Sequence, residues 1–181
     1  KTGTYTTVVK SPVRNGSFSI DPLGQVRFVV GYGSDNRAKT YYRDNNDAEW
    51  ELINDETVTE KNISSAGFSA DGKTVYIESE EPNGPNAIYI FNPVSKEKKL
   101  LMVDNNVDPA GYLTSPVDGG LYGVAYDDGR PRYEYIDKES PFAKMHASLQ
   151  KSLPSQILVP TSFSQDGNLA IVQGYADNVP G

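Results

Sequence analysis

A short turn motif recurs along the chain at nearly constant spacing, and this repeat limits the fold more than any other feature. Phe-Ser-x-Asp occurs three times, and a degenerate fourth copy at residues 114–119 lies between the second and the third. The aspartates of the four copies follow one another at intervals of 50, 47 and 48 residues: Asp21, Asp71, Asp118 and Asp166. Self-similarity at a period of roughly 20–50 residues is typical of architectures built from repeated supersecondary units.

The segments between these turns repeat as well, and they have the composition of strands. An apolar stretch follows each turn, and a polar loop and a second stretch rich in tyrosine come after it. Short β-branched and aromatic stretches, bounded by Gly, Pro, Asn and Asp, are typical of β-strands. The apolar stretches are 26–32, 74–78, 121–126 and 169–175; the tyrosine-rich stretches are 39–43, 87–91 and 132–136; two units add a further stretch at 49–53 and 98–103.

The Asp-Gly pairs in the turns favour tight hairpins. Glycine takes positive φ without a steric cost, and an aspartate side chain accepts hydrogen bonds from the backbone of its own turn. We therefore predict that Asp71-Gly72 and Asp166-Gly167 each join the first two strands of a unit, with the glycine at positive φ.

A unit of four short antiparallel strands and about 48 residues has the size of one propeller blade. The predicted fold class is therefore all-β: a partial β-propeller of four-stranded antiparallel blades, with about 3.8 repeats in residues 1–181. One blade cannot bury both of its faces, so blades stack around an axis. The predicted blades are residues 15–60, 61–108 and 109–155, followed by the first half of a further blade at 156–181.

Both ends of this array are predicted to be open. Residues 1–14 contain an alternating stretch, 2–10, that we expect to be an outer strand of a preceding blade, and the last blade lacks two strands. The chain, which begins with Lys1, is thus expected to be a slice of a larger propeller. Unpaired strand edges and uncovered faces favour association, so we also expect self-association through the open edges, with two chains favoured over closure within one.

One segment, residues 140–153, departs from the strand pattern. It begins with a serine, which is a favoured N-cap residue, followed by a proline at the first helical position. Its apolar residues then repeat at helical spacing along one face, up to a terminating proline: Phe142, Met145, Leu149, Leu153 and Pro154. The sequence predicts a short helix of about three turns inserted in the third blade.

Composition excludes several classes of function. The formal net charge of −7 argues against a nucleic-acid partner, because affinity for nucleic acid comes largely from cationic neutralisation of phosphates. The chain has no cysteine and a single histidine, so it can form neither a thiolate site nor a multi-histidine metal site. Its apolar runs are too short to span a bilayer. We therefore expect no metal, no cofactor and no membrane span.

Ser69 and His146 are the two candidate catalytic residues. Residues 67–71 resemble the nucleophile elbow Gly-x-Ser-x-Gly, but the last position is Asp and the context is strand–turn–strand instead of strand–turn–helix. The Phe-Ser-x-Asp motif also recurs, which is typical of a structural motif and not of a nucleophile. His146 lies in the predicted helix. A catalytic histidine needs a serine nucleophile held against it, and no serine of this chain lies in a nucleophile elbow, so we interpret His146 as a partly exposed helix residue. No catalytic residue is predicted.

Three other patterns suit ligands but are interpreted as structural. Residues 69–74 resemble the Asp-box of sialidase propellers, although the glycine comes one residue early and the tryptophan is absent. Residues 44–47 and 104–108 offer oxygen ligands for calcium without the Gly and Glu of an EF-hand loop. In the acidic run 78–81, Glu78 and Glu80 are expected on one side of a strand, where they could hold a substrate ammonium group, yet such runs are more often solvated. The binding residues stay unassigned.

The chain resembles the β-propeller domain of the prolyl oligopeptidase family, in particular its bacterial dipeptidyl- and acylaminoacyl-peptidase-like members. The resemblance runs over nearly the whole chain, through residues 26–43, 49–52, 68–91, 125–133 and 163–181. In that family the propeller accompanies an α/β-hydrolase domain that carries a Ser-Asp-His triad. No residue of that triad matches a position of this chain.

The resemblance implies a non-catalytic propeller region of a bacterial serine peptidase, which restricts or guides peptide access to a hydrolase domain absent from this chain. The implied partners are that α/β-hydrolase domain and peptide substrates, and the implied location leans towards the periplasm or the exterior. The alternative is a protein-interaction scaffold of the TolB or WD-repeat type, and a glycosidase propeller comes third. A Gly-x-Ser-x-Gly motif downstream of residue 181, followed by Asp and His, would distinguish the first two.

Overall fold

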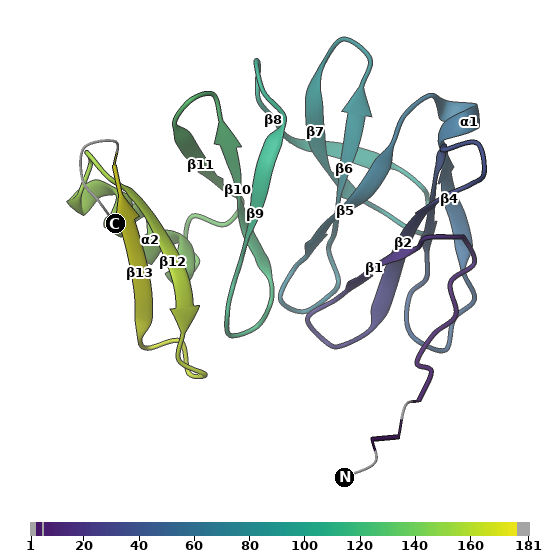
Figure 1. Cartoon of the computed structure of the whole chain (residues 1–181), viewed down its shortest axis with the longest axis horizontal. Helices are drawn as coiled ribbons and strands as arrows, with labels where there is room; N and C mark the ends of the chain where they lie inside the picture. The colour runs from purple at the N-terminus through teal and green to yellow at the C-terminus, as the bar shows by residue number, and fades with distance from the viewer. Residues whose placement is uncertain (1–2, 5, 177–181) are drawn as a thin grey trace.

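The computed structural model describes residues 3–4 and 6–176, and its strands form four antiparallel sheets that follow one another along the chain (Figure 1). The first sheet contains β1 (Ser17–Ile20), β2 (Val26–Tyr32), β3 (Ala38–Tyr42) and β4 (Glu51–Asp55). The second contains β5 (Ile63–Phe68), β6 (Val75–Glu81), β7 (Gly84–Phe91) and β8 (Lys98–Val103). The third contains β9 (Pro109–Thr114), β10 (Leu121–Asp127) and β11 (Pro131–Tyr135), and the fourth contains β12 (Ile157–Phe163) and β13 (Ala170–Tyr175).

Each sheet is a meander in which neighbouring strands are also consecutive in the sequence. The sheets stand side by side, and their long hairpin loops lie at two opposite ends of the molecule (Figure 1). Within the described part of the chain, no sheet closes on itself into a barrel. The prediction of an all-β fold built from successive antiparallel units is thus confirmed. The prediction of four strands in every complete unit is wrong for the third sheet, which has three strands among the described residues because the chain enters α2 after β11. The helical insertion is confirmed as α2 (Pro141–Ser152), one residue shorter at each end than predicted.

The predicted hairpin turns are confirmed in position and conformation. The loop 69–74 joins β5 to β6, and the loop 164–169 joins β12 to β13. Gly72 has φ of 68° and Gly167 has φ of 72°, a region that residues with a Cβ rarely adopt. The first and third sheets use the same device, with glycine at positive φ in the corresponding turns.

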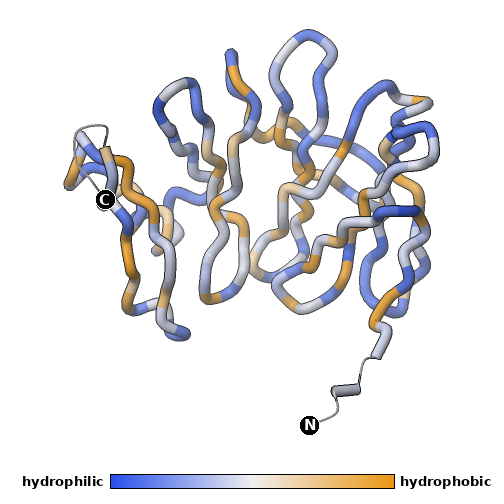
Figure 2. The backbone as a smooth tube through the Cα atoms, viewed as in Figure 1, coloured by the Kyte–Doolittle hydropathy of each residue, from blue (hydrophilic) through white to orange (hydrophobic). Residues whose placement is uncertain are grey.

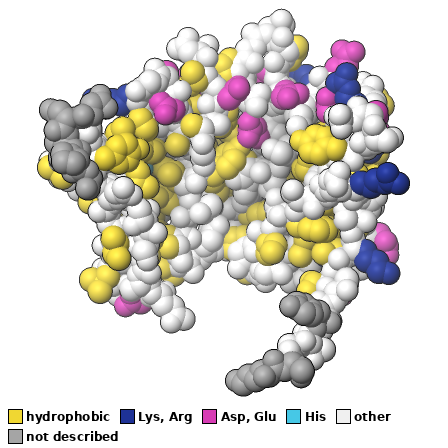
Figure 3. Space-filling view, viewed as in Figure 1, with side chains coloured by type: hydrophobic (Ala, Val, Ile, Leu, Met, Phe, Trp, Pro, Cys, Tyr) yellow, Lys and Arg dark blue, Asp and Glu magenta, His cyan; other side chains and the backbone are white. Residues whose placement is uncertain are grey.

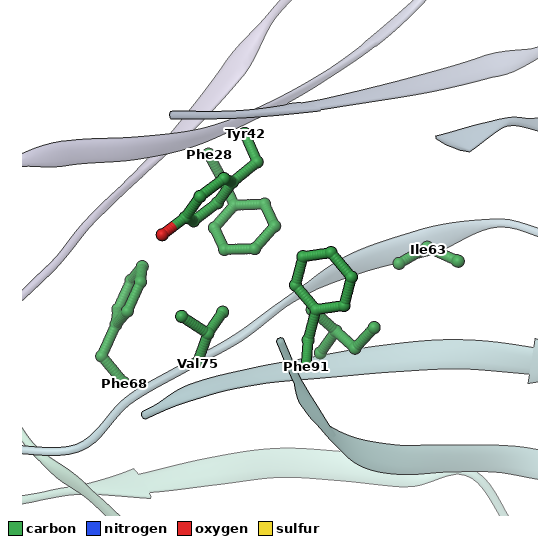
Figure 4. Close-up of a cluster of buried hydrophobic side chains, with 7 residues drawn as sticks. Phe28, Tyr42, Ile63, Phe68, Val75 and Phe91 are labelled. Carbon is green, nitrogen blue, oxygen red and sulfur yellow. The ribbon is translucent and has the colours of Figure 1, made fainter. Parts of the chain in front are cut away.

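The main core lies between the first and second sheets. It is formed mostly by aromatic and β-branched side chains that project from facing sheets (Figure 4): Phe28, Tyr42, Ile63, Phe68, Val75, Ile77 and Phe91. The rings of Phe28 and Tyr42 meet edge to face at a centroid distance of 5.1 Å, which is a favoured arrangement of aromatic pairs. Full burial of a large apolar side chain contributes roughly 1.5–3 kcal/mol, so this layer holds the two sheets face to face.

A second core joins the second and third sheets, so the second sheet is covered on both faces. Its buried members come from β5, β6, β7 and β10: Ala66, Tyr76, Ile88, Leu121, Val124 and Tyr126. Figure 2 shows the same pattern along the chain, with hydrophobic stretches in the strands and hydrophilic residues in most loops. The fourth sheet is less covered: Leu169 and Ile171 are 74% and 67% exposed, and hydrophobic side chains gather on the surface over β12 and β13 (Figure 3).

The expected strand over residues 2–10 is not formed in the part of it that the structure describes, residues 3–4 and 6–10. A strand is stable only when a neighbour accepts and donates its backbone hydrogen bonds, and no described strand pairs with this segment. Its end is held by the indole of Trp50, which donates to the carbonyl oxygen of Lys10 at 3.1 Å. Residues 1, 2, 5 and 177–181, on which parts of the predicted end strands fall, lie outside the described residues.

A short helix, α1 (Glu56–Thr59), follows β4 and was not predicted from the sequence. Asp55 caps it by accepting a hydrogen bond from the backbone N–H of Thr57 at 3.0 Å, which is the usual role of an N-cap carboxylate. A helix of one turn leaves no periodic pattern in the sequence, so only its cap residue could have indicated it.

Candidate functional site

A cavity of about 630 Å³ lies where the hairpin loops of the second, third and fourth sheets meet the start of α2. Turn residues from three repeats line it, together with apolar side chains from β6, β10 and α2. The apolar lining includes Tyr76, Leu121, Tyr122, Phe142 and Met145, and the polar lining includes Ser69, Ser115, Asp118, Asp137, Ser140, Asp166 and Asn168. The repeat that defines the fold therefore also builds this cavity.

Three carboxylates line the cavity, and each of them is fixed by the backbone of its own turn. Asp118 Oδ1 accepts from the N–H of Gly120 at 3.1 Å, and Asp137 Oδ1 accepts from the N–H of Glu139 at 2.9 Å. The hydroxyl of Ser164 donates to Asp166 at 2.6 Å. This bond, with further donation from Asn168, lowers the pKa of Asp166 to about 2, so the group stays ionised at neutral pH.

Helix α2 forms the apolar wall of the cavity. The ring of Phe142 lies 6.3 Å from that of Tyr122 in β10 and 6.0 Å from that of Phe163 at the end of β12. The aromatic contacts therefore place the helix between the third and fourth sheets. The predicted face of the helix is only partly correct, because Leu153 is 46% exposed while the buried helix residues are Ala143 and His146.

His146 is buried, with 2% of its surface exposed, which corrects the expectation of a partly exposed residue. Its Nδ1 lies 3.0 Å from the hydroxyl oxygen of Tyr135, and the ring of Tyr133 meets it edge to face at 4.5 Å. Burial lowers its pKa, so the neutral imidazole is favoured. The two tyrosines of β11 explain the orientation, because they offer an aromatic slot and a hydrogen-bond partner that helical periodicity alone does not reveal.

Ser69 lies at the cavity but does not meet His146. Its hydroxyl donates to Asp71 Oδ1 at 2.6 Å and accepts from the backbone N–H of Thr74 at 2.9 Å. Ser164 makes the equivalent contacts with Asp166 and Leu169 in the fourth sheet. Both serines therefore close their turns, and no hydrogen bond among the described residues joins either of them to the imidazole of His146.

The carboxylates of the acidic run 78–81 are engaged by neighbouring groups. Glu78 accepts from the hydroxyl of Tyr112 and from the side-chain amide of Asn86. Glu80 accepts from the backbone N–H of Asn62 at 2.7 Å. Glu81 lies 2.9 Å from Lys61 Nζ and also accepts from Tyr89. Each carboxylate thus has a hydrogen-bond or ion-pair partner within the chain.

The two loops with oxygen ligands, 44–47 and 104–108, are also occupied by internal contacts. Asp44 accepts from the hydroxyl of Tyr42, and Asp104 accepts from the backbone of Asn106 and from the guanidinium of Arg132. Across residues 3–4 and 6–176, no group of three or more histidine or acidic side chains is arranged to hold a metal ion.

The lining of this cavity combines negative charge with apolar surface. Carboxylates of fixed orientation face a partly aromatic wall, and no lysine or arginine of the described part of the chain lines the cavity, so it suits a group that combines positive charge with an apolar surface. The sequence indicated the aspartates of the turns. It did not indicate Asp137 or Tyr76, because nothing local shows that residues about 60 positions apart share one cavity.

Comparison with known proteins gives a distant similarity. The chain is 24% identical over 136 residues to dipeptidyl aminopeptidase BIII of Pseudoxanthomonas mexicana. The similarity covers 75% of this chain but 20% of the relative, so the chain spans about a fifth of the length of the protein that it matches. No family model and no solved structure matches the chain. In the described residues, neither helix has the length and hydrophobicity that a membrane crossing requires.

Proposed function

We propose that the four sheets are successive blades of a β-propeller, and that this chain is the non-catalytic propeller region of a peptidase-related protein. In this proposal the blades comprise residues 15–60, 61–108, 109–155 and 156–181, after an N-terminal segment at 1–14. The region restricts or guides peptide access to an α/β-hydrolase domain that is not part of residues 1–181.

The observation that carries the propeller is the convergence of the hairpin loops. Sheets that stack face to face are spaced by about 10 Å, so in a parallel stack the first and third sheets would lie about 20 Å apart. A β-carbon at Gly119, in the third sheet's turn, would lie 3.5 Å from Cβ of Pro22 in the first sheet's turn. This proximity supports sheets that converge at this end, as blades do around an axis.

The charges of the edge strands support the same arrangement. The first strand of every sheet, namely β1, β5, β9 and β12, contains no charged residue, whereas the last strands β4, β8 and β11 do. An exposed edge strand without charge is prone to pair with other chains. A propeller protects such strands because they line a narrow central channel.

The peptidase relationship rests on the similarity to the dipeptidyl aminopeptidase, and the non-catalytic role rests on the internal contacts of Ser69 and His146. A serine hydrolase needs a nucleophile, a base within hydrogen-bond reach and a group that orients the base. The hydroxyl of Ser69 is hydrogen-bonded within its own turn, and His146 pairs with tyrosine.

A direct test is an activity assay on the purified chain with aminoacyl- and dipeptidyl-nitroanilides. We expect no turnover. Turnover that disappears in Ser69→Ala or His146→Ala would refute the non-catalytic role. Sequencing the gene beyond the codon for residue 181 tests the peptidase relationship. The translated sequence should contain a Gly-x-Ser-x-Gly motif followed by Asp and His, which would mark the hydrolase domain.

A second candidate function is a protein-interaction scaffold of the TolB or WD-repeat type. The exposed apolar side chains of the fourth sheet favour it, because uncovered patches of this kind are typical of interaction surfaces. A reading frame that ends without the hydrolase motif would favour this function over the first.

A further inference from the structure

A second cavity, of about 430 Å³, lies between the outer edges of the first and second sheets and shares no residue with the turn-lined cavity. Its floor is apolar and comes from four different strands: Ile53 of β4, Ile63 of β5, Ile77 of β6 and Phe91 of β7. Three of these floor residues are at most 7% exposed, so the floor is an open face of the main core.

The rim of this cavity is cationic although the chain as a whole is acidic. Lys61, Lys96 and Lys98 line it, and no aspartate or glutamate among residues 3–4 and 6–176 does, in a chain of net charge −7. Two of the ammonium groups are neutralised from outside the cavity. Lys61 lies 2.9 Å from Glu81, and Lys96 lies 2.6 Å from Glu51.

Lys98 is the exception. Among the described residues, no carboxylate oxygen lies within 4.0 Å of its ammonium group, which sits 5.1 Å from the centre of the Tyr89 ring. Partial burial lowers the pKa of Lys98, the charge of Lys61 lowers it further, and the charge of Glu81 raises it. Lys98 is exposed as a residue, and its ammonium group lies near the like charge of Lys61 without forming an ion pair of its own among the described residues.

We propose that this cavity binds a carboxylate carried on a short aliphatic chain. The carboxylate lies against Lys98 and Lys61, and the aliphatic chain covers the apolar floor. An inorganic anion would leave the floor exposed to water, and a neutral hydrocarbon would leave the ammonium of Lys98 unpaired. An aliphatic carboxylate satisfies both requirements, and this site is independent of the propeller and peptidase proposals.

Hexanoate is a suitable probe, titrated into the ¹⁵N-labelled chain while backbone amide shifts are followed by NMR. We expect saturable shifts around β4 and β8, with a Kd on the order of 1–10 mM for a ligand of this size, and no shifts around Asp118 in the turn-lined cavity. Hexanamide, which lacks the charge, and acetate, which lacks the aliphatic chain, should each bind at least about tenfold more weakly. No saturable shift with hexanoate, or equal binding of hexanamide, overturns the proposal.

Variants on β8 locate the charge. Lys98→Gln should weaken hexanoate binding about tenfold, whereas Lys98→Arg should retain it. Lys99→Gln is the matched control, because it makes the same change in the adjacent residue of the strand and Lys99 does not line the cavity. Circular dichroism establishes that each variant is folded. Equal affinity of the Lys98→Gln and Lys99→Gln variants overturns the assignment.

Discussion

Arg27 in β2 donates a hydrogen bond from Nη1 to the carbonyl oxygen of Gly72, 3.0 Å away in the turn of the second sheet. The same nitrogen lies 3.0 Å from Oδ2 of Asp21, whose side chain is 1% exposed. One guanidinium group therefore neutralises a buried carboxylate in the first turn and binds the backbone of the second. Its plane also faces the rings of Tyr42 and Phe68, so it is part of the contact between the two sheets.

Replacement of Arg27 should be strongly destabilising. Arg27→Met leaves the carboxylate of Asp21 buried without a counter-charge, although the backbone N–H groups of Leu23 and Gln25 still donate to it, and breaking a buried ion pair in this way typically costs about 3–5 kcal/mol. Urea unfolding followed by circular dichroism measures the loss. Lys96→Met is the control, since the ion pair of Lys96 with Glu51 is exposed and should contribute about 1 kcal/mol or less. Similar losses in the two variants would contradict the structural role of Arg27.

Gly72 should not tolerate a side chain. Its φ is 68°, and a β-carbon there would lie 3.3 Å from Oδ2 of Asp21. Gly72→Val should therefore lower the free energy of unfolding by about 1 kcal/mol or more. Gly84→Val is the matched control, because no heavy atom lies within 4 Å of its β-carbon position and its φ is not positive. The assignment of the turn fails if both variants melt at the same temperature.

The features predicted correctly from the sequence are local ones. The hairpins at Gly72 and Gly167 and the helix over residues 140–153 each depend on residues only a few positions apart, and such patterns are visible in a single sequence. The same prediction could be made for all four copies of the turn motif, because similar segments form similar structures.

The features that were missed depend on contacts between distant residues. Arg27 binds the carbonyl of Gly72, 45 residues further along the chain, and nothing near either residue indicates the other. The burial of His146 likewise depends on Tyr133 and Tyr135 of β11. In its described part, residues 3–4 and 6–10, the expected strand is not formed for the converse reason: its local pattern is suitable for a strand, but no described strand pairs with it.

Mild acidification should destabilise the fold through protonation of His146. Burial lowers the pKa of His146 below its ordinary value near 6.5, so the unfolded chain binds the proton more readily than the folded chain. The contribution of neutral His146 to the free energy of unfolding should therefore be fully present above about pH 6.5. It should be lost as the pH decreases towards the pKa of the folded state. Urea midpoints measured between about pH 5 and 7.5 should show this slope.

The control for this pH dependence is His146→Gln, which keeps a polar side chain and cannot be protonated. Because His146 is the only histidine of the chain, the slope between about pH 5 and 6.5 should flatten in the variant. Carboxylates with lowered pKa values, such as that of Asp166, lose their contribution only at more acidic pH. An unchanged slope in His146→Gln would mean that other groups control stability in this range.

The convergence of the first and third sheets can be tested with an engineered disulfide, since the chain contains no cysteine to interfere. Pro22 Cβ and the β-carbon position of Gly119 are 3.5 Å apart, within the range of about 3.5–4.5 Å found in disulfides. The double variant Pro22→Cys/Gly119→Cys should form an intramolecular disulfide under mild oxidation, with no free thiol left to titrate and faster migration on a non-reducing gel. A cysteine at Gly119, where φ is 71°, costs about 1–2 kcal/mol. Closing a loop of nearly 100 residues offsets this with about 4–5 kcal/mol.

Pro22→Cys/Val58→Cys is the matched control for the disulfide. Val58 is 80% exposed and lies in α1, at the opposite end of the molecule from the β1–β2 loop (Figure 1). This pair should keep both thiols or link separate chains. Because a parallel stack would hold the first and third sheets about 20 Å apart, free thiols in the Pro22→Cys/Gly119→Cys variant would contradict the convergence of the loops and, with it, the propeller arrangement that we propose.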